Sequence, residues 1–363
     1  MSEHNQVLYR KYRPKSFNEV IGQEQVVRVL NNSLKQGRVA HAYLFSGPRG
    51  VGKTTIARLI AKAVNCIGEE GPCNICESCN EFNSGSSFNL IEIDAASNRG
   101  IDEVRELRES VRFVPSRGKY KVYVIDECHQ LTKDAFNALL KTLEEPPEHA
   151  IFILATTELD KVPATITSRT QQFDFRRPSI KDTKNKLAKI CGMEGVDFED
   201  EALETVALIA EGSLRDAESV LGRILAVADK SITAETIYKV LGLPKKEYIR
   251  SLFSCLASNE KGKAFSLISE MAKEGYDMQY IAKILIRYLR NSLLLKTDMT
   301  LEAVLLEGET REDLYFLKQH LGSFSNERLT NGIRIFLAAQ ELLKKSPIPQ
   351  LPLEMAVYEL TKS

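Results

Sequence analysis

A glycine-rich octapeptide offers the clearest chemistry in this sequence. Residues 47–54 read Gly-Pro-Arg-Gly-Val-Gly-Lys-Thr, a complete G-x-x-x-x-G-K-T loop between an apolar run at 42–45 and a helical apolar pattern at 56–63. Backbone N–H groups of such a loop can close around phosphates, Lys53 can reach the β- and γ-phosphates, and the Thr54 hydroxyl can hold Mg²⁺. A glycine-rich turn before an ordinary helix is the alternative. We expect a nucleoside triphosphate to bind Gly47, Pro48, Arg49, Gly50, Val51, Gly52, Lys53, Thr54 and Thr55.

A pair of carboxylates forms a candidate catalytic site. Asp126 and Glu127 directly follow the apolar run 122–125. Ligands of open parallel sheets bind at the carboxyl ends of the strands, so Asp126 is placed to support Mg²⁺ and Glu127 to orient and deprotonate an attacking water. Together with Cys128 and His129 the pair is similar to the DExH box of helicases, although ordinary packing is the alternative interpretation of these last two residues.

Two more polar side chains stand where a nucleotide could reach them. Thr157 follows the apolar run 151–154 and can hydrogen-bond a γ-phosphate or a water, but threonine is also common at strand ends. Arg215 opens a helical pattern just after Gly212, where a helix-start ion pair with Asp216 is the alternative.

Four of the seven cysteines lie close together in the sequence. Cys66, Cys73, Cys76 and Cys79 offer four thiols within fourteen residues. Zinc binds four thiolates in a tetrahedron, and two-residue spacers let one turn supply several of them. Four free cysteines or a redox pair are the alternatives. We expect a structural Zn²⁺ in a small module over about 64–82.

Composition limits the class of protein. The 363 residues carry 49 basic and 49 acidic side chains, so the protein as a whole is not a polyanion binder, and nucleic-acid contacts must come from a local patch. No apolar run approaches the ~20 residues that span a bilayer, and no apolar signal segment opens the chain. We expect a cytoplasmic protein of two or three domains.

The motifs lie in a chain whose pattern changes twice. Residues 1–178 alternate helical patterns with short apolar runs at 44–45, 90–93, 122–125, 151–154 and 173–175, which predicts a doubly wound α/β domain with a parallel sheet. After residue 178 the strand signals stop. Residues 179–242 predict a small helical bundle, and residues 243–363 predict a second all-helical domain.

Taken in order, the motifs carry a family resemblance. They are Tyr12-Arg13-Pro14, Gly22-Gln23, the loop 47–54, Asp126-Glu127-Cys128-His129, Ala155-Thr156-Thr157, Ser168-Arg169 and Gly212-Ser213-Leu214-Arg215-Asp216-Ala217. The sequence resembles the AAA+ clamp-loader ATPases, and most closely the gamma/tau family of bacterial DNA polymerase III. The resemblance is dense over 7–217. It implies an AAA+ P-loop domain with a zinc module, a helical lid and a C-terminal helical collar.

The resemblance also implies roles for single residues. Thr157 would be the sensor-1 residue, Arg215 the sensor-2 residue of the lid, and Arg169 an arginine finger that reaches a neighbouring subunit's γ-phosphate. Leu214 and Arg215 would both contact the nucleotide. The adenine pocket would be lined by Tyr12, Arg13, Pro14, Ile21 and Gly22. ATP, Mg²⁺ and Zn²⁺ would be the bound groups. Where the family commonly has cysteine after Ser-Arg, this chain has Thr170.

The partners implied are other clamp-loader subunits in a pentameric spiral, a ring-shaped sliding clamp, and primed DNA held by its phosphates. Candidate phosphate contacts are Arg99, Arg105 and Lys141, for which simple solvation is the alternative. The function expected is an ATP-driven motor that loads the clamp. Two other interpretations stay open: a DNA-translocating motor of the branch-migration type, and a nucleotide-binding scaffold without turnover.

Overall fold

The computed structural model describes residues 6–68, 71–115, 117–227, 231–306 and 309–362. The chain forms two compact units. The first comprises Met1–Ile190 with Ala210–Gly222, and the second Cys191–Ile209 with Arg223–Ser363. The domain boundaries at 178 and 242 stay predictions from the sequence.

A five-stranded parallel sheet organises the first unit. Its strands are β1 (Ala42–Ser46), β2 (Leu90–Asp94), β3 (Lys121–Asp126), β4 (Ala150–Thr156) and β5 (Gln171–Asp174), in the order β2-β3-β4-β1-β5. The five predicted apolar runs all become strands. Every residue of β1 and β4 is buried, as expected for strands covered on both faces. Because Asp94 pairs with Asp126 and Ser46 with Thr156, the carboxyl ends of neighbouring strands meet at one edge.

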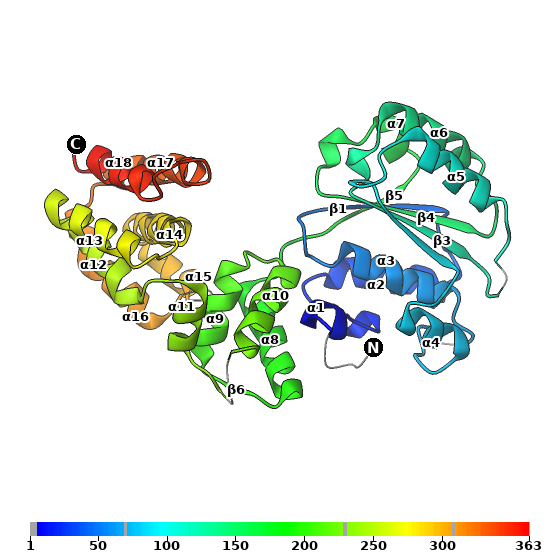
Figure 1. Ribbon diagram of the computed structural model, residues 1–363, viewed down its shortest axis with the longest axis horizontal. Coiled ribbons are helices and arrows are strands. Elements are labelled where there is room, and N and C mark those ends of the chain that lie inside the picture. Colours follow the sequence, from blue (N-terminus) through cyan, green and yellow to red (C-terminus); the bar gives the residue numbers. More distant parts are fainter. Residues whose placement is uncertain (1–5, 69–70, 116, 228–230, 307–308, 363) are drawn as a thin grey trace. The chain divides into compact units, whose positions relative to one another are not determined.

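Helices cover both faces of this sheet (Figure 1). The helices that begin in this unit are α1 (Leu8–Lys11), α2 (Glu24–Lys35), α3 (Lys53–Val64), α4 (Glu77–Ser84), α5 (Ile101–Val111), α6 (Lys133–Glu144), α7 (Ala164–Thr167), α8 (Ile180–Glu194) and α10 (Leu214–Leu225), of which α2 and α3 lie on one face of the sheet and α5 and α6 on the other. Leu30 of α2 and Ile56 of α3 belong to the core on one face, with Phe45. Leu107 of α5 and Leu139 of α6 belong to the core on the other face. The sheet edge that carries the carboxylates is left for ligands.

The regular elements among the described residues of the second unit are helices, with one small exception. Its helices are α9 (Asp200–Ile209), α11 (Ala234–Leu241), α12 (Lys246–Ala257), α13 (Lys261–Lys273), α14 (Met278–Thr297), α15 (Glu302–Leu305), α16 (Arg311–His320), α17 (Asn326–Leu343) and α18 (Leu351–Leu360). The exception is a parallel pair of two-residue strands, β6 (Asp197–Phe198) and β7 (Ser231–Ile232). The sequence prediction of no strand after residue 178 is therefore wrong. Strands this short show no alternation of apolar and polar residues, so they leave no signal in the sequence.

None of the helices among the described residues is long and apolar enough to cross a lipid bilayer.

Candidate nucleotide-binding site

The glycine-rich loop joins β1 to α3 and depends on its glycines. Gly47, Gly50 and Gly52 have φ angles of 139°, 77° and 103°, which residues other than glycine rarely adopt. A Cβ on Gly50 would lie 2.1 Å from the Ser213 hydroxyl oxygen. The N–H of Leu214, the first residue of α10, donates to the Gly50 carbonyl at 3.0 Å. The loop thus touches the start of α10 directly.

Lys53 lies inside the curve of this loop. It is 6 % exposed, and its Nζ donates to the carbonyl oxygens of Gly47 at 2.6 Å and Pro48 at 2.9 Å. Burial lowers the pKa of Lys53, against the attraction of Glu127 and Asp126. The ammonium group is therefore held by two carbonyl oxygens of the loop itself.

The next residue meets the first carboxylate. The Thr54 hydroxyl donates to Oδ2 of Asp126 at 2.9 Å, across 72 residues of sequence. A hydroxyl and a carboxylate are both oxygen ligands of the kind that Mg²⁺ prefers. The donor set fits a magnesium ion held by Thr54 and Asp126.

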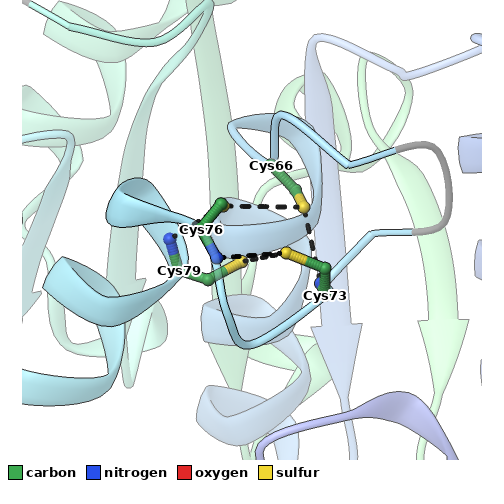
Figure 2. A group of neighbouring side chains, drawn as sticks. All are labelled: Cys66, Cys73, Cys76 and Cys79. Carbon is green, nitrogen blue, oxygen red and sulfur yellow. Dashed lines mark hydrogen bonds between the residues drawn. The ribbon is translucent and has the colours of Figure 1, made fainter.

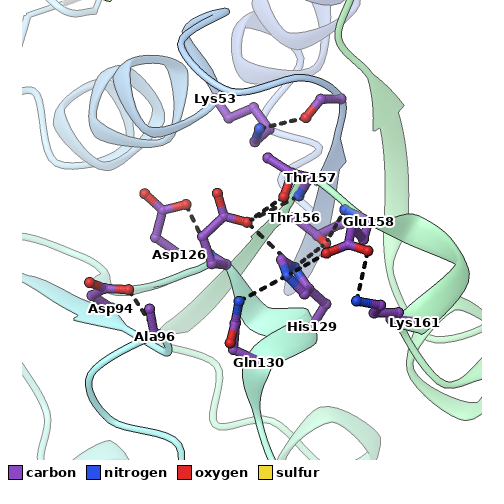
Figure 3. A network of polar contacts seen from close by, with 12 residues as sticks. Lys53, Asp94, Ala96, Asp126, His129, Gln130, Thr156, Thr157, Glu158 and Lys161 are labelled. Atoms are coloured by element: carbon purple, nitrogen blue, oxygen red, sulfur yellow. Dashed lines mark hydrogen bonds and ion pairs between the residues drawn. The ribbon is translucent and has the colours of Figure 1, made fainter. Parts of the chain in front are cut away.

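Glu127 is held by the neighbouring strand end. Its Oε2 accepts from the backbone N–H of Thr157 at 3.2 Å and from the Thr157 hydroxyl at 2.9 Å. Glu127 also has a φ of 48°, an uncommon backbone conformation for a residue with a side chain. Figure 3 shows Thr156, Thr157 and His129 grouped at the ends of β3 and β4 beside Asp126. The arrangement fixes the direction of a carboxylate that can serve as a general base.

The two residues after Glu127 behave differently from each other. Cys128 is fully buried, and burial raises the pKa of its thiol to about 12, so packing explains it. The His129 side chain is 4 % exposed, with Nδ1 2.9 Å from Oγ1 of Thr156 and Nε2 3.3 Å from Oε1 of Glu158. His129 is thus part of the polar network as well as of the packing.

A cleft of about 840 Å³ brings most of the predicted nucleotide residues together. Those that line it are Arg13, Pro14, Ile21, Arg49, Gly50, Val51, Gly52, Lys53, Thr54, Thr55, Asp126, Glu127, Leu214 and Arg215. Predicted residues outside its lining are Tyr12, Gly22, Gly47, Pro48, Thr157 and Arg169. Gly22 instead has a φ of 73° and packs closely on Pro178, and Thr157 acts on the cleft through Glu127.

The cleft is also lined by residues that the sequence did not predict, among them Tyr9, Lys186 and Glu218. The Arg215 guanidinium lies over the Tyr9 ring, 4.8 Å from its centroid. No ion pair between Arg215 and Asp216 occurs among the residues described. A nearly buried ion pair joins Lys186 of α8 to Glu218 of α10 at 2.6 Å, and burial raises the pKa of Glu218 against the pull of Lys186. No motif or local spacing relates these partners, so nothing in the sequence could have found them.

Arg169 lies away from its own cleft. Its Nη2 donates to Oε1 of Glu144, at the end of α6, at 2.6 Å, and its Nη1 donates to the carbonyl of Thr165 at 2.8 Å. The side chain is 36 % exposed. The guanidinium therefore reaches the surface and does not line the nucleotide cleft of its own chain.

The four clustered cysteines converge on one point (Figure 2). Their sulfur atoms lie within 4.8 Å of one another, with 4.0 Å between Cys66 and Cys76 and 3.9 Å between Cys73 and Cys79. Four thiolates at a Zn–S distance of ~2.3 Å would be about 3.8 Å apart, so the donor set fits a tetrahedral zinc ion. Backbone N–H groups of Ile75 and Cys76 lower the pKa of Cys73 to about 6, whereas burial raises that of Cys79 to about 12.

The candidate DNA contacts lie on the surface of the first unit. Nε of Arg99 donates to the Ala96 carbonyl at 2.9 Å, and Arg105 of α5 pairs with Asp102 at 3.1 Å. Lys141 is exposed on α6. All three are available to solvent, which fits phosphate contact and simple solvation equally.

A parallel sheet with this loop, these carboxylates and a following helical segment defines a nucleotide-binding domain of the AAA+ class. Three family models match successive parts of the chain: "DNA polymerase III, delta subunit" over 22–179, "DNA polymerase III clamp loader subunit, ATPase lid domain" over 182–230, and "DNA polymerase III subunits gamma and tau domain III" over 232–363.

Individual relatives agree with the family models. DNA polymerase III subunit gamma of Buchnera aphidicola is 42 % identical over 294 residues, which cover 80 % of this chain and 81 % of that protein. Subunit tau of Bacillus subtilis is 41 % identical over 360 residues, or 99 % of this chain and 63 % of that protein. This chain belongs to the gamma/tau family of DNA polymerase III clamp-loader subunits.

The chain matches only part of the length of the tau subunits. The chain spans 63 % of Bacillus subtilis tau and, at 44 % identity, 43 % of Escherichia coli tau. Among solved structures, the RuvB Holliday junction branch migration motor of Thermotoga maritima is 23 % identical, with a TM-score of 0.49 over 67 % of this chain and 78 % of that one.

Proposed function

We propose that this chain is the ATP-hydrolysing motor subunit of a DNA polymerase III clamp loader. In this role it binds ATP, helps to open the sliding clamp and place it on primed DNA, and releases it on hydrolysis. One observation carries the proposal: Thr54 meets Asp126 at 2.9 Å beside a Glu127 that is held in place by Thr157. A phosphate loop, a metal-binding pair and an oriented carboxylate are the parts that ATP hydrolysis needs.

The reacting end of ATP would lie between the loop and the strand ends. Lys53 would turn from the loop carbonyls to the β- and γ-phosphates and neutralise part of their charge. Mg²⁺ held by Thr54 and Asp126 would draw further negative charge from the phosphates. Glu127 would accept a proton from the attacking water, while Thr157 keeps its carboxylate turned toward that water.

The other end of the cleft would hold the base and sense the nucleotide. Arg13, Pro14 and Ile21 line the cleft and are proposed to contact adenine. Tyr12 and Gly22 do not line the cleft, and we propose that they support the backbone of these neighbouring residues. Arg215 would exchange its contact with Tyr9 for the γ-phosphate. Since Leu214 is hydrogen-bonded to Gly50, that exchange would be felt by the start of α10.

Arg169 is proposed to act on the neighbouring subunit. Its guanidinium is exposed and outside its own cleft, as a finger working across an interface requires. The assembly would contain other clamp-loader subunits in a pentameric spiral, with the sliding clamp as its cargo. Arg99, Arg105 and Lys141 are proposed to touch the phosphates of primed DNA. A protein with this task would work in the cytoplasm.

The cysteine cluster is proposed to hold a structural zinc ion. Four protein ligands leave no open coordination position, so the ion would stabilise the module and take no part in hydrolysis. Cys73→Ser should release the ion. Elemental analysis that finds no zinc in the native protein would exclude this role.

The deciding experiment is ATP turnover by the chain with and without primed DNA, sliding clamp and partner subunits, with Lys53→Ala as the blank. We expect stimulation that requires both the clamp and a primer junction, and that is lost in Arg169→Ala. Stimulation by any DNA without regard to the clamp would favour a DNA-translocating motor. No turnover under any combination would leave a nucleotide-binding scaffold.

A further inference from the structure

The cysteine module forms part of the wall of the nucleotide cleft. Phe82, Asn83, Ser84 and Gly85, at the end of its helix α4, line the same cleft as Lys53 and Asp126. A role restricted to local stability gives no reason for this placement. The module therefore has a physical route to the nucleotide site.

That route passes through a buried lysine. Lys62 of α3 is 3 % exposed, and its Nζ donates to three acceptors from three segments. They are Oδ1 of Asn74, Oδ1 of Asn83 at 2.5 Å, and the carbonyl oxygen of Lys15 at 3.1 Å. A lysine ammonium has three donors, so all of its capacity is used. In each bond the donor is the buried positive charge of Lys62. A buried charge that loses a hydrogen-bond partner is costly, so these bonds hold their three acceptors firmly.

Two of the three acceptors belong to the cysteine module, and the third belongs to the segment proposed to hold the base of the nucleotide. Asn74 lies between Cys73 and Cys76 with a φ of 62°, and Asn83 lies in the helix that carries Cys79. Lys15 directly follows Arg13 and Pro14, which line the cleft where the base is proposed to bind.

Lys62 is also well placed to respond to the charge of the cluster. Four thiolates around one Zn²⁺ carry two negative charges in excess. Lys62 supplies a buried positive charge that is electrostatically coupled to Cys79 and Cys73. A filled cluster would therefore hold the ammonium group, and with it the Lys15 carbonyl, in one position.

We propose that Lys62 is a positioning residue through which the zinc-filled cysteine cluster sets the affinity of the cleft for ATP. The inference rests on the proposed ATP-binding function and adds a regulation to it. Lys62 does not itself reach the phosphates, because it is nine residues beyond Lys53 and a helix rises about 1.5 Å per residue, or roughly 13 Å in all. Lys62 also lines the cleft itself, beside Lys15 and Asn83, so a variant that leaves Lys62 in place is needed to separate an effect passed on from the module from a direct one.

The test measures zinc content by elemental analysis and the dissociation constant for ATP with Mg²⁺ by calorimetry, on the full chain. Lys62→Met removes the three donors. We expect zinc to be retained and the dissociation constant to rise about tenfold, a usual size for coupling between two sites. Cys73→Ser should lose zinc and weaken ATP binding in the same direction. Lys119→Met, an exposed lysine near the module, is the matched control and should match the wild type in both measurements.

Asn74 gives a second test that does not depend on how well Lys62→Met folds. Glycine accepts the left-handed backbone at this position, so Asn74→Gly removes the acceptor without adding strain. Asn74 does not line the cleft, so a weaker affinity for ATP in this variant must pass through its partners Lys62 and Asn83, which both line the cleft. Asn74→Asp keeps an oxygen acceptor for Lys62 and should bind ATP with wild-type affinity. If Asn74 only shaped the loop, the affinity for ATP would not depend on whether residue 74 keeps this acceptor.

The outcomes separate this inference from the function on which it rests. Wild-type ATP affinity in Asn74→Gly or Lys62→Met with zinc in place would overturn the inference, and so would wild-type affinity in a zinc-free Cys73→Ser. A wild-type chain that binds no ATP would instead overturn the proposed function itself.

Discussion

Thr157 donates two hydrogen bonds to a single oxygen of Glu127, one from its backbone N–H at 3.2 Å and one from its hydroxyl at 2.9 Å. The two residues are 30 positions apart and follow β3 and β4, which are neighbours in the sheet. The direction of the carboxylate is therefore decided by an adjacent strand and not by its own. This relationship makes the role of each residue separately testable.

Glu127→Gln should abolish hydrolysis while ATP still binds. Glutamine keeps an oxygen that Thr157 can bond, but its amide cannot take a proton. We expect turnover in the stimulated assembly to fall about 10²- to 10⁴-fold, the usual contribution of a positioned base. Steady-state turnover and calorimetric ATP affinity measured on the same protein check this. Turnover close to the wild type would remove Glu127 from the reaction.

Thr157→Val should slow hydrolysis by about tenfold or more, because a hydrogen bond to a charged group is worth about 1.5–3 kcal/mol and only the backbone bond remains. Thr157→Ser keeps the hydroxyl and serves as the control. Turnover is measured at saturating ATP, so that a change in affinity does not enter. Equal rates for the valine and serine variants would contradict a role of the hydroxyl.

Gly50→Ala should destabilise the protein and weaken ATP binding. A Cβ there would meet the Ser213 hydroxyl oxygen at 2.1 Å, on a backbone with φ of 77°. Gly37→Ala is a close control, since its φ is 67° with no atom within 4 Å of the added Cβ. The left-handed backbone alone costs about 1–2 kcal/mol in either variant. The excess loss in Gly50→Ala, seen by thermal unfolding and ATP titration, measures the contact between the loop and α10.

Arg169→Ala should lower the turnover of the assembly, because a finger acting in trans is worth roughly 10³–10⁵ in rate. Mixing provides a sharper test than the single variant. Arg169→Ala and Glu127→Gln subunits are each expected to be inactive alone. Assembled together, they form some interfaces with an intact Glu127 facing an intact Arg169, and part of the activity should return. No recovery in mixtures of confirmed composition would mean that both residues serve the same subunit's site.

Asp313, in the second unit, should make stability depend on acid pH. It is 5 % exposed and accepts from Arg250 at 2.7 Å and Thr310 at 2.7 Å; these partners lower the pKa of Asp313 although burial opposes them. Because the pKa of Asp313 is lower in the folded protein than in the unfolded chain, its ionised carboxylate stabilises the fold at pH values above the unfolded-chain pKa. That stabilisation is lost as the pH falls from the unfolded-chain pKa through the folded one.

Asp313→Asn tests this sign. At pH 7 it should cost roughly 3 kcal/mol, since it removes the charge that pairs with Arg250 at 2.7 Å and leaves Arg250 only the longer contact with the exposed Glu312 at 3.9 Å. The difference from wild type in urea-induced unfolding should be the same at pH 5 and should shrink below about pH 4, where aspartate in an unfolded chain is protonated. A difference that stays constant to pH 3 would show that charge is not the cause.

Most of the first unit follows from local patterns in the sequence. All five predicted apolar runs are strands, and the helix after the phosphate loop begins at Lys53, because continuous apolar runs and helical spacing are read over a few residues. The pair β6 and β7 escaped prediction because two residues carry no period. In the cleft, the loop, Asp126 and Glu127 came from motifs, whereas Tyr9, Lys186 and Glu218 belong to no motif.

The sequence by itself determined the chemical groups: the phosphate loop, the carboxylates at a strand end and the four cysteine ligands at workable spacing. Only the tertiary structure decided which distant groups meet. The contacts of Thr54 with Asp126, of Glu127 with Thr157, and of Lys62 with both Lys15 and the cysteine module depend on strand order and helix packing. The physical reason is that spacing along the chain encodes neighbours within a turn or strand, while long-range neighbours are chosen by burial of apolar faces that many residues share.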